Sequence, residues 1–200
     1  MSEELTSELL LAAYSSGVFP MGDPDGEIYW YSPDPRCVLE FDRFHVSHTL
    51  RQTVRQRKFE IRIDDSFERV IDSCSNRREG TWISPPVREA YCRLNREGHA
   101  HSVEAWRDGK LAGGLYGVAI GGAFFGESMF HTARDASKVA LVALMERLKQ
   151  RGYALVDTQW STPHLESFGA IEITRGEYLR RLDEAVHMPC RFKDGQAAGE

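Results

Sequence analysis

Two polar residues, Asp157 and Gln159, follow a short apolar run in the last quarter of a 200-residue chain. The run Tyr153-Ala154-Leu155-Val156 is typical of a strand covered on both faces, and strand residues two apart point to the same side. A carboxylate and an amide placed there can orient and polarise reacting groups, although an amide is a poor base. The alternative is that both side chains only cap the following turn.

Glu127 is a second candidate because it lies on a predicted strand directly after Phe124-Phe125-Gly126. An unpaired buried charge is costly, so an acid beside aromatic rings is expected to be paired or functional. A structural ion pair with Arg134 or Lys138 is the alternative to a functional role.

Charge and composition exclude several classes of protein. The chain has 25 basic and 30 acidic residues, a net charge of −5, which excludes a generally basic nucleic-acid coat but not a local basic patch. No apolar run approaches the roughly 18 residues of a membrane span, and the N-terminus Met1-Ser2-Glu3-Glu4 lacks the bases of a targeting signal, so a cytoplasmic protein is expected. Four scattered cysteines and no HExxH motif argue against disulfides and a metal site.

Hydrophobic spacing and turn residues predict the elements that position these side chains. Helices are expected over residues 5–16, 47–56, 66–74, from after Pro86 to about residue 97, 136–150 and 177–186, with a helical turn over 163–168. Strands are expected over 28–31, 59–63, 99–106, 110–120, 123–129 and 153–157. The proline-rich remainder of residues 19–36 is predicted to be ordered loop.

An antiparallel meander followed by a buried helix and one more strand predicts an α+β fold. The same order is similar to the core of the N-acetyltransferase-like (GNAT-like) fold, a mixed sheet flanked by helices. That fold usually holds the pyrophosphate of acetyl-CoA in a glycine-containing loop, whereas residues 131–138 contain no glycine. We therefore expect a small, reduced N-terminal lobe (1–36), an acetyltransferase-like catalytic domain (37–188) without coenzyme A, and a polar C-terminal tail (189–200).

Six motifs in register resemble the leucyl/phenylalanyl-tRNA–protein transferase family, over about residues 9–186. They are Tyr14-Ser15-Ser16-Gly17-Val18-Phe19-Pro20, Trp30-Tyr31-Ser32-Pro33-Asp34-Pro35-Arg36, Glu79-Gly80-Thr81-Trp82-Ile83, Phe125-Gly126-Glu127-Ser128-Met129-Phe130, Ala136-Ser137-Lys138 and Asp157-Thr158-Gln159.

The resemblance implies transfer of leucine or phenylalanine from aminoacyl-tRNA to proteins that begin with arginine or lysine, which marks them for degradation. It implies no metal, ATP or coenzyme, and we expect a monomer. It also makes Asp157 and Gln159 the catalytic pair, with Gln159 polarising the reacting groups and Asp157 orienting or relaying a proton. Glu127 is then either the anchor for the acceptor or the group that accepts its amine.

An apolar pocket is required to select leucine or phenylalanine by fit. The resemblance assigns its walls to residues on the predicted strands and buried helix: Leu115, Phe124, Leu141, Leu144 and Val156. An aromatic platform suits the terminal adenosine of the tRNA, and Trp82 is the candidate for it. Met21 stands where many relatives have tryptophan, so a second wall is assigned to Met21 or to Trp30.

A basic stretch over residues 43–62 carries six bases against one acid, a net charge of +5. Arg51 and Arg55 are four apart and share a face of the predicted helix. Together with Arg57 and Lys58 they are predicted to bind tRNA phosphates, because such contacts are sequence-independent. A solvated charged face is the alternative.

Two other functions fit parts of the pattern. An acyl-CoA N-acetyltransferase fits the predicted fold, but the phosphate loop is missing. A non-catalytic adaptor that binds tRNA or basic N-termini fits the charge distribution, but it would not need the intact Asp157, Gln159 and Glu127.

Overall fold

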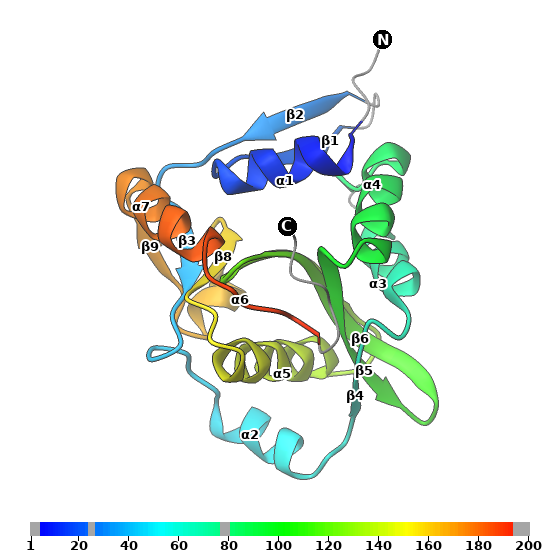
Figure 1. Ribbon diagram of the computed structural model, residues 1–200. Helices are drawn as coiled ribbons and strands as arrows, with labels where there is room; N and C mark the ends of the chain where they lie inside the picture. The colour runs from blue at the N-terminus through cyan, green and yellow to red at the C-terminus, as the bar shows by residue number, and fades with distance from the viewer. Residues whose placement is uncertain (1–4, 24–26, 77–80, 194–200) are drawn as a thin grey trace.

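A seven-stranded mixed sheet forms the centre of the computed structural model, which describes residues 5–23, 27–76 and 81–193 (Figure 1). Neighbouring strands are antiparallel except for the parallel pair β7–β8. The mixed α+β class expected from the sequence is confirmed. The strands, in spatial order, are β4 (Glu60–Ile63), β5 (Ala100–Arg107), β6 (Lys110–Ile120), β7 (Ala123–His131), β8 (Leu155–Gln159), β3 (Arg36–Leu39) and β9 (Ile171–Ile173).

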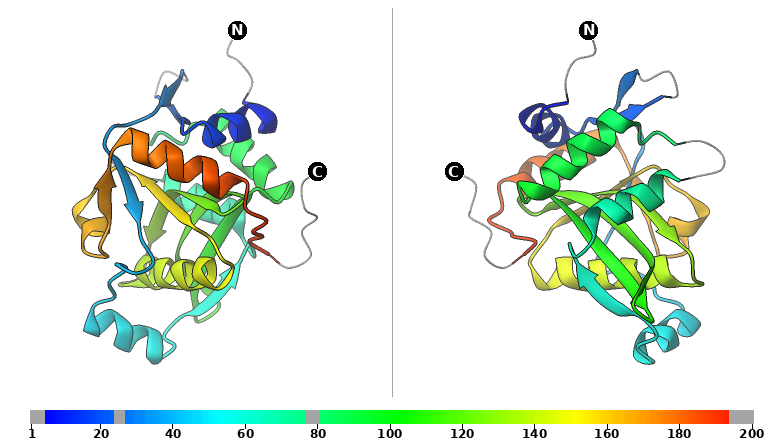
Figure 2. Two further views of the ribbon diagram at one scale, coloured as in Figure 1. Left: turned by 60° about the vertical axis from the view of Figure 1, so that its left-hand side comes forward. Right: turned by 90° about the vertical axis from the view of Figure 1, so that its right-hand side faces the viewer.

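Helices cover both faces of this sheet (Figure 2). On one face lies α5 (Ala136–Gln150), which packs with Leu115, Phe124 and Val156 of the sheet. The other face is covered by four helices, α1 (Ser7–Ser15), α3 (Phe67–Ser75), α4 (Pro85–Arg96) and α7 (Arg175–Val186). Two short helices, α2 (His48–Arg55) and α6 (Pro163–Glu166), and the hairpin of β1 (Phe19–Gly22) and β2 (Ile28–Tyr31) complete the described elements.

Helix ends follow from local side-chain chemistry. Ser47 caps α2, since its hydroxyl accepts the N–H of Leu50 at 3.3 Å. Thr6 and Thr174 cap α1 and α7 in the same way. Gly98 ends α4 with a φ of +84°, the left-handed conformation that glycine adopts without strain.

Three short strands were not predicted: β1, β3 and β9. The segment expected to be loop around one strand contains β1 as well as β2, and it leads directly into β3. Each of these strands has three or four residues, too few to show a clear alternation. β3 forms because it pairs with β8, more than 110 residues later in the chain, and with β9.

The parallel strands β7 and β8 diverge, and this places the functional site. They pair over Ala123–Phe125 and Leu155–Asp157, and neither strand pairs with the other beyond those residues. The residues that follow, Gly126 on β7 and Thr158 on β8, line a cavity between the two strands.

Candidate functional site

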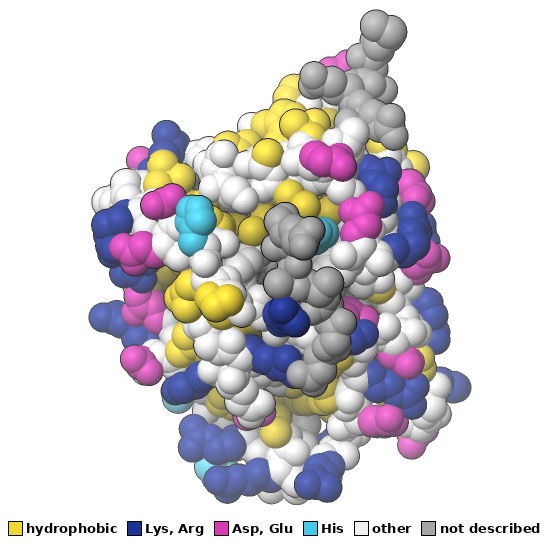
Figure 3. Space-filling model, viewed as in Figure 1, with side chains coloured by type: hydrophobic (Ala, Val, Ile, Leu, Met, Phe, Trp, Pro, Cys, Tyr) yellow, Lys and Arg dark blue, Asp and Glu magenta, His cyan; other side chains and the backbone are white. Residues whose placement is uncertain are grey.

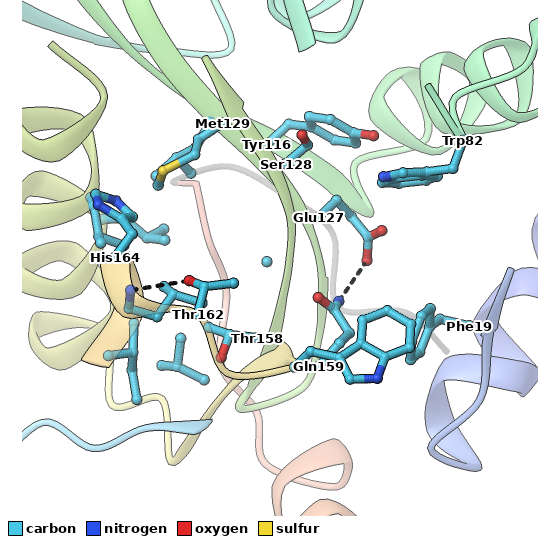
Figure 4. A pocket seen from close by; sticks show the side chains of 18 of the residues that line it. Phe19, Trp82, Tyr116, Glu127, Ser128, Met129, Thr158, Gln159, Thr162 and His164 are labelled. Atoms are coloured by element: carbon cyan, nitrogen blue, oxygen red, sulfur yellow. Dashed lines mark hydrogen bonds between the residues drawn. The ribbon is translucent and has the colours of Figure 1, made fainter. Parts of the chain in front are cut away.

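A cavity of about 340 Å³ lies where β7 and β8 diverge. Figure 4 shows Glu127, Gln159, Phe19 and Trp82 at one end of it, and Met129 and His164 at the other. The cavity therefore has a polar end with aromatic walls and a mainly apolar end. Its lining residues come from β1, β3, β6, β7, α5, β8, α6 and the segments beside them: Phe19, Met21, Leu39, Trp82, Leu115, Tyr116, Gly126, Glu127, Ser128, Met129, Leu141, Leu144, Val156, Thr158, Gln159, Trp160, Thr162, His164 and Leu165.

Glu127 is the centre of a hydrogen-bond network at the polar end. The hydroxyl of Tyr14 donates to its Oε1 at 2.7 Å, and the hydroxyl of Tyr91 lies 3.3 Å from its Oε2. The two tyrosine hydroxyls are also hydrogen-bonded to each other. Gln159 Nε2 donates to Glu127 Oε1 at 3.3 Å, so the amide oxygen of Gln159 points away from Glu127 (Figure 4). The ion pairs proposed as an alternative do not form, since Arg134 and Lys138 lie next to Asp135.

Desolvation changes the acidity of this network. The pKa of Glu127 is raised from 4.5 to about 8. Burial is the largest cause and the nearby Asp157 adds to it, whereas the hydrogen bonds from Tyr14 and Tyr91 lower the pKa. Burial also raises the pKa values of Tyr14 and Tyr91, so both stay protonated. Glu127 is thus a weaker acid in this network than an ordinary glutamate side chain.

Asp157 lies behind the cavity rather than in its wall. It is completely buried and forms a bidentate pair with Arg36, at 2.9 Å from Nε and 2.6 Å from Nη2. The hydroxyl of Tyr178 donates to its Oδ2 at 2.8 Å. Asp157 is not among the residues that line the cavity, and of those residues its carboxylate contacts Gln159. The expectation that Asp157 orients or relays a proton stays a prediction.

Gln159 is held by that buried carboxylate. Its backbone N–H donates to Asp157 Oδ1 at 2.9 Å, and its φ is +60°, in the left-handed region that non-glycine residues seldom adopt. Cys37 on β3 is its partner across the strand pair. The backbone is therefore fixed on both sides where the side chain enters the cavity.

The apolar end contains four of the five residues assigned to the side-chain pocket: Leu115, Leu141, Leu144 and Val156. Leu39, Met129 and Leu165 complete its wall. Burial is the largest cause that lowers the pKa of His164, which favours the neutral form of this imidazole. Phe124 does not line the cavity, because it is fully buried and its ring stacks on Phe192, with ring centroids 5.6 Å apart.

Aromatic side chains surround the polar end. Trp82 and Met21 both line the cavity, and Trp82 is fixed beside β1 because its carbonyl accepts the N–H of Gly22 at 3.0 Å. Trp30 does not line the cavity. Its neighbours Tyr29 and Tyr31 pair with Met21 and Phe19, the residues of β1 that line the cavity, so Trp30 points to the other side of the hairpin.

The predicted tRNA-binding residues are all exposed, on α2 or directly after it: Arg51, Arg55, Arg57 and Lys58. Figure 3 shows Lys and Arg side chains gathered at the lower end of the molecule, where α2 lies in Figure 1. Arg62, in contrast, is paired with Glu60 and Asp65. The four bases on and directly after α2 are therefore more exposed than the ion-paired Arg62.

Several site residues carried no role in the sequence analysis. Tyr14 and Arg36 belong to the motifs, and their positions there were the only signal for them. Tyr91, Tyr178, Trp160 and His164 lie in helices or at strand ends without a recognisable pattern, so only the tertiary structure identifies them.

Two classes of feature are absent from the described part of the chain. None of the helices in residues 5–23, 27–76 and 81–193 is long and apolar enough to cross a membrane. In the same ranges no group of three or more His, Cys, Asp or Glu side chains is arranged to hold a metal ion.

Comparison with known proteins identifies close relatives. Residues 38–183 match the family model for leucyl/phenylalanyl-tRNA protein transferase, and residues 3–34 match the model for the N-terminal domain of leucyl/phenylalanyl-tRNA protein transferase. The leucyl/phenylalanyl-tRNA–protein transferase of Gloeobacter violaceus is 54% identical over 94% of this chain and 98% of its own. The protein of the same name from Herpetosiphon aurantiacus is 53% identical over 96% and 100%. The resemblance expected from the motifs is confirmed.

Among solved structures, L-PGS from Bacillus licheniformis is similar, with 14% identity and a TM-score of 0.42. The match covers 80% of this chain and 55% of that one. Similarity at this level supports no conclusion about the site.

Proposed function

Because this chain belongs to the leucyl/phenylalanyl-tRNA–protein transferase family, we propose that it moves leucine or phenylalanine from aminoacyl-tRNA to proteins that begin with arginine or lysine. The chain is an enzyme, an aminoacyltransferase. The observation that carries the substrate assignment is one cavity with an apolar end and a Glu127–Gln159 end. The acceptor would be marked for degradation by the transfer.

The donor fits the cavity in two parts. Trp82 and Met21 take the terminal adenosine, by stacking and by soft packing of the thioether on the ring. The leucyl or phenylalanyl side chain enters the apolar end between Leu141, Leu144 and Val156. The ester then lies between these two sites, next to Gln159.

The reaction needs positioning and proton transfer rather than activation. The ester is already activated, and an α-amino group with a pKa of roughly 7.7 to 8.0 is partly neutral at pH 7. The amine nitrogen attacks the ester carbonyl carbon, the bond from that carbon to the ribose oxygen breaks, and a peptide bond forms. The proton that the nitrogen loses ends on the ribose oxygen.

We assign three roles to the polar end. The amide oxygen of Gln159, which points away from Glu127, accepts an N–H of the incoming amine and orients it. Glu127 carries the proton, since its pKa of about 8 lies close to that of the amine and makes the exchange nearly balanced. Asp157 is a positioning residue that fixes the backbone of Gln159.

Further properties belong to this proposal. The arrangement of β5, β6, β7, α5 and β8 is consistent with a GNAT-like fold, with the cavity at the diverging parallel strands. The exposed bases on and after α2 bind phosphates of the tRNA acceptor stem. The enzyme works in the cytoplasm, because its substrates are aminoacyl-tRNA and folded proteins. It works as a monomer, because one chain contains every group invoked above.

The test is transfer of radiolabelled leucine or phenylalanine from tRNA to a protein beginning with arginine. A protein differing only by an N-terminal glycine is the negative control. We expect label on the first protein, and at least a hundredfold slower transfer with Gln159→Ala, in the range for removal of a polarising group. Binding without transfer would favour the adaptor, and acetylation by acetyl-CoA would favour the acetyltransferase. Unchanged transfer by Gln159→Ala would refute the role of Gln159.

A further inference from the structure

An exposed aromatic group lies beside Gln159, on the other side of the polar end from Trp82. We call Phe19, Tyr31 and Trp160 the aromatic shelf. The Trp160 ring meets the Phe19 ring edge-on, with centroids 5.1 Å apart and planes at 84°. It also meets the Tyr31 ring at 5.9 Å and 72°. Phe19 is buried, but Trp160 and Tyr31 are 42% and 38% exposed.

The backbone places the shelf next to the reacting groups. Trp160 directly follows Gln159, and its N–H donates back to the carbonyl of Thr158 at 2.8 Å, which turns the chain at the end of β8. Trp160, Thr158 and Gln159 all line the cavity. The shelf is therefore continuous with the cavity wall and still open to solvent.

The donor leaves this side of the cavity free. Phe19 and Met21 are two apart on β1. Phe19 contacts Trp160, and Gly22, the residue after Met21, is hydrogen-bonded to the Trp82 carbonyl. In the proposed function the adenosine occupies the Met21 side, and the aminoacyl side chain occupies the apolar end under α5. This binding mode leaves the side over Trp160 for the amine of the acceptor.

We propose that the aromatic shelf binds the side chain of the second residue of the acceptor polypeptide and favours an aromatic residue there. Consecutive Cα atoms are 3.80 Å apart, so a first residue whose amine meets Gln159 brings the second residue to Trp160. The three shelf side chains carry no charge, and the guanidinium over Phe19, that of Arg36, is buried and paired with Asp157. The shelf thus suits an uncharged ring rather than a phosphate. This inference rests on the proposed function.

The experiment compares two acceptor peptides that begin Arg-Phe and Arg-Ser and are otherwise identical. We expect kcat/KM to be about 3- to 10-fold higher for Arg-Phe with the natural enzyme, which corresponds to one aromatic contact. Trp160→Ala should lower kcat/KM for Arg-Phe by that factor and leave Arg-Ser nearly unchanged. Trp30→Ala is the matched control, because Trp30 is 37% exposed on the hairpin that carries Phe19 and Tyr31 but does not line the cavity. It should not change the ratio of the two kcat/KM values.

A second pair of measurements separates the acceptor from the tRNA. Each variant is assayed with phenylalanyl-tRNA and with phenylalanyl-adenosine, which lacks the preceding nucleotides. If Trp160 stacks on a nucleotide, Trp160→Ala raises the KM only for phenylalanyl-tRNA, with either peptide, and the inference is wrong. Equal rates for the two peptides with the natural enzyme also overturn it, although transfer itself supports the proposed function. Failure of transfer to both peptides refutes the proposed function.

Discussion

The backbone N–H of Gln159 donates a 2.9 Å hydrogen bond to the carboxylate of Asp157, a residue that makes no contact with the cavity. Asp157 is paired with Arg36, and Gln159 has a left-handed backbone. The two polar residues that share one strand end therefore have different tasks. One is a buried support, and the other presents its amide to the cavity.

Asp157→Asn should be strongly destabilising, because it leaves the guanidinium of Arg36 buried without a counter-charge. We expect the free energy of unfolding to fall by roughly 3 to 5 kcal/mol, measured by urea denaturation. Asp72→Asn is the control, since Asp72 pairs with Arg88 but is 53% exposed, and it should cost less than about 1 kcal/mol. Similar small losses for both variants would show that the buried pair is not important for stability.

Glu127 should make stability depend on pH between about 4.5 and 8. Its pKa is raised in the folded state, so the folded protein holds this proton where the unfolded chain releases it. The resulting stabilisation is complete below about 4.5 and is lost as the pH rises through about 8. The side chain introduced by Glu127→Gln cannot titrate. The natural protein should therefore lose unfolding free energy relative to the variant as the pH rises over that range. A constant difference would contradict the raised pKa.

Leu144→Phe should narrow the specificity for the donor. Leu144 lines the apolar end, and an added ring takes space that a phenylalanyl side chain needs more than a leucyl one does. We expect kcat/KM for phenylalanyl-tRNA to fall about tenfold relative to leucyl-tRNA, in competition between the two donors. Val142→Leu, on the same helix but outside the cavity wall, should leave this ratio unchanged. An unchanged ratio in Leu144→Phe would place the side-chain pocket elsewhere.

Removal of two exposed basic side chains on α2 should weaken the binding of aminoacyl-tRNA but not that of phenylalanyl-adenosine. For Arg51→Ala combined with Arg55→Ala, we expect a higher KM for aminoacyl-tRNA and a shallower dependence of binding on salt. The slope of log K against log salt should fall in magnitude by about 1 to 2, because the variant neutralises fewer phosphates and binding therefore releases fewer counter-ions. Transfer from phenylalanyl-adenosine, which has no acceptor stem, should stay the same. Equal effects on both donors would exclude a contact with the stem.

The sequence by itself determined the mixed α+β class, most helices and long strands, and the family. These follow from local signals: the caps at Ser47 and Gly98, the meander of residues 99–131, and six motifs in register. It also indicated residues that the structure brings together, since Glu127, Gln159, Trp82 and four of the five assigned pocket residues line one cavity.

Only the tertiary structure decided how those residues are arranged around the cavity. Spacing along a strand gives the side on which Asp157 and Gln159 lie, but not that Arg36 and Tyr178 enclose Asp157 from β3 and α7. The strands β3 and β9 form through partners distant in the chain, and the cavity exists because β7 and β8 diverge after three residue pairs. These contacts are non-local, so no window of the sequence contains them.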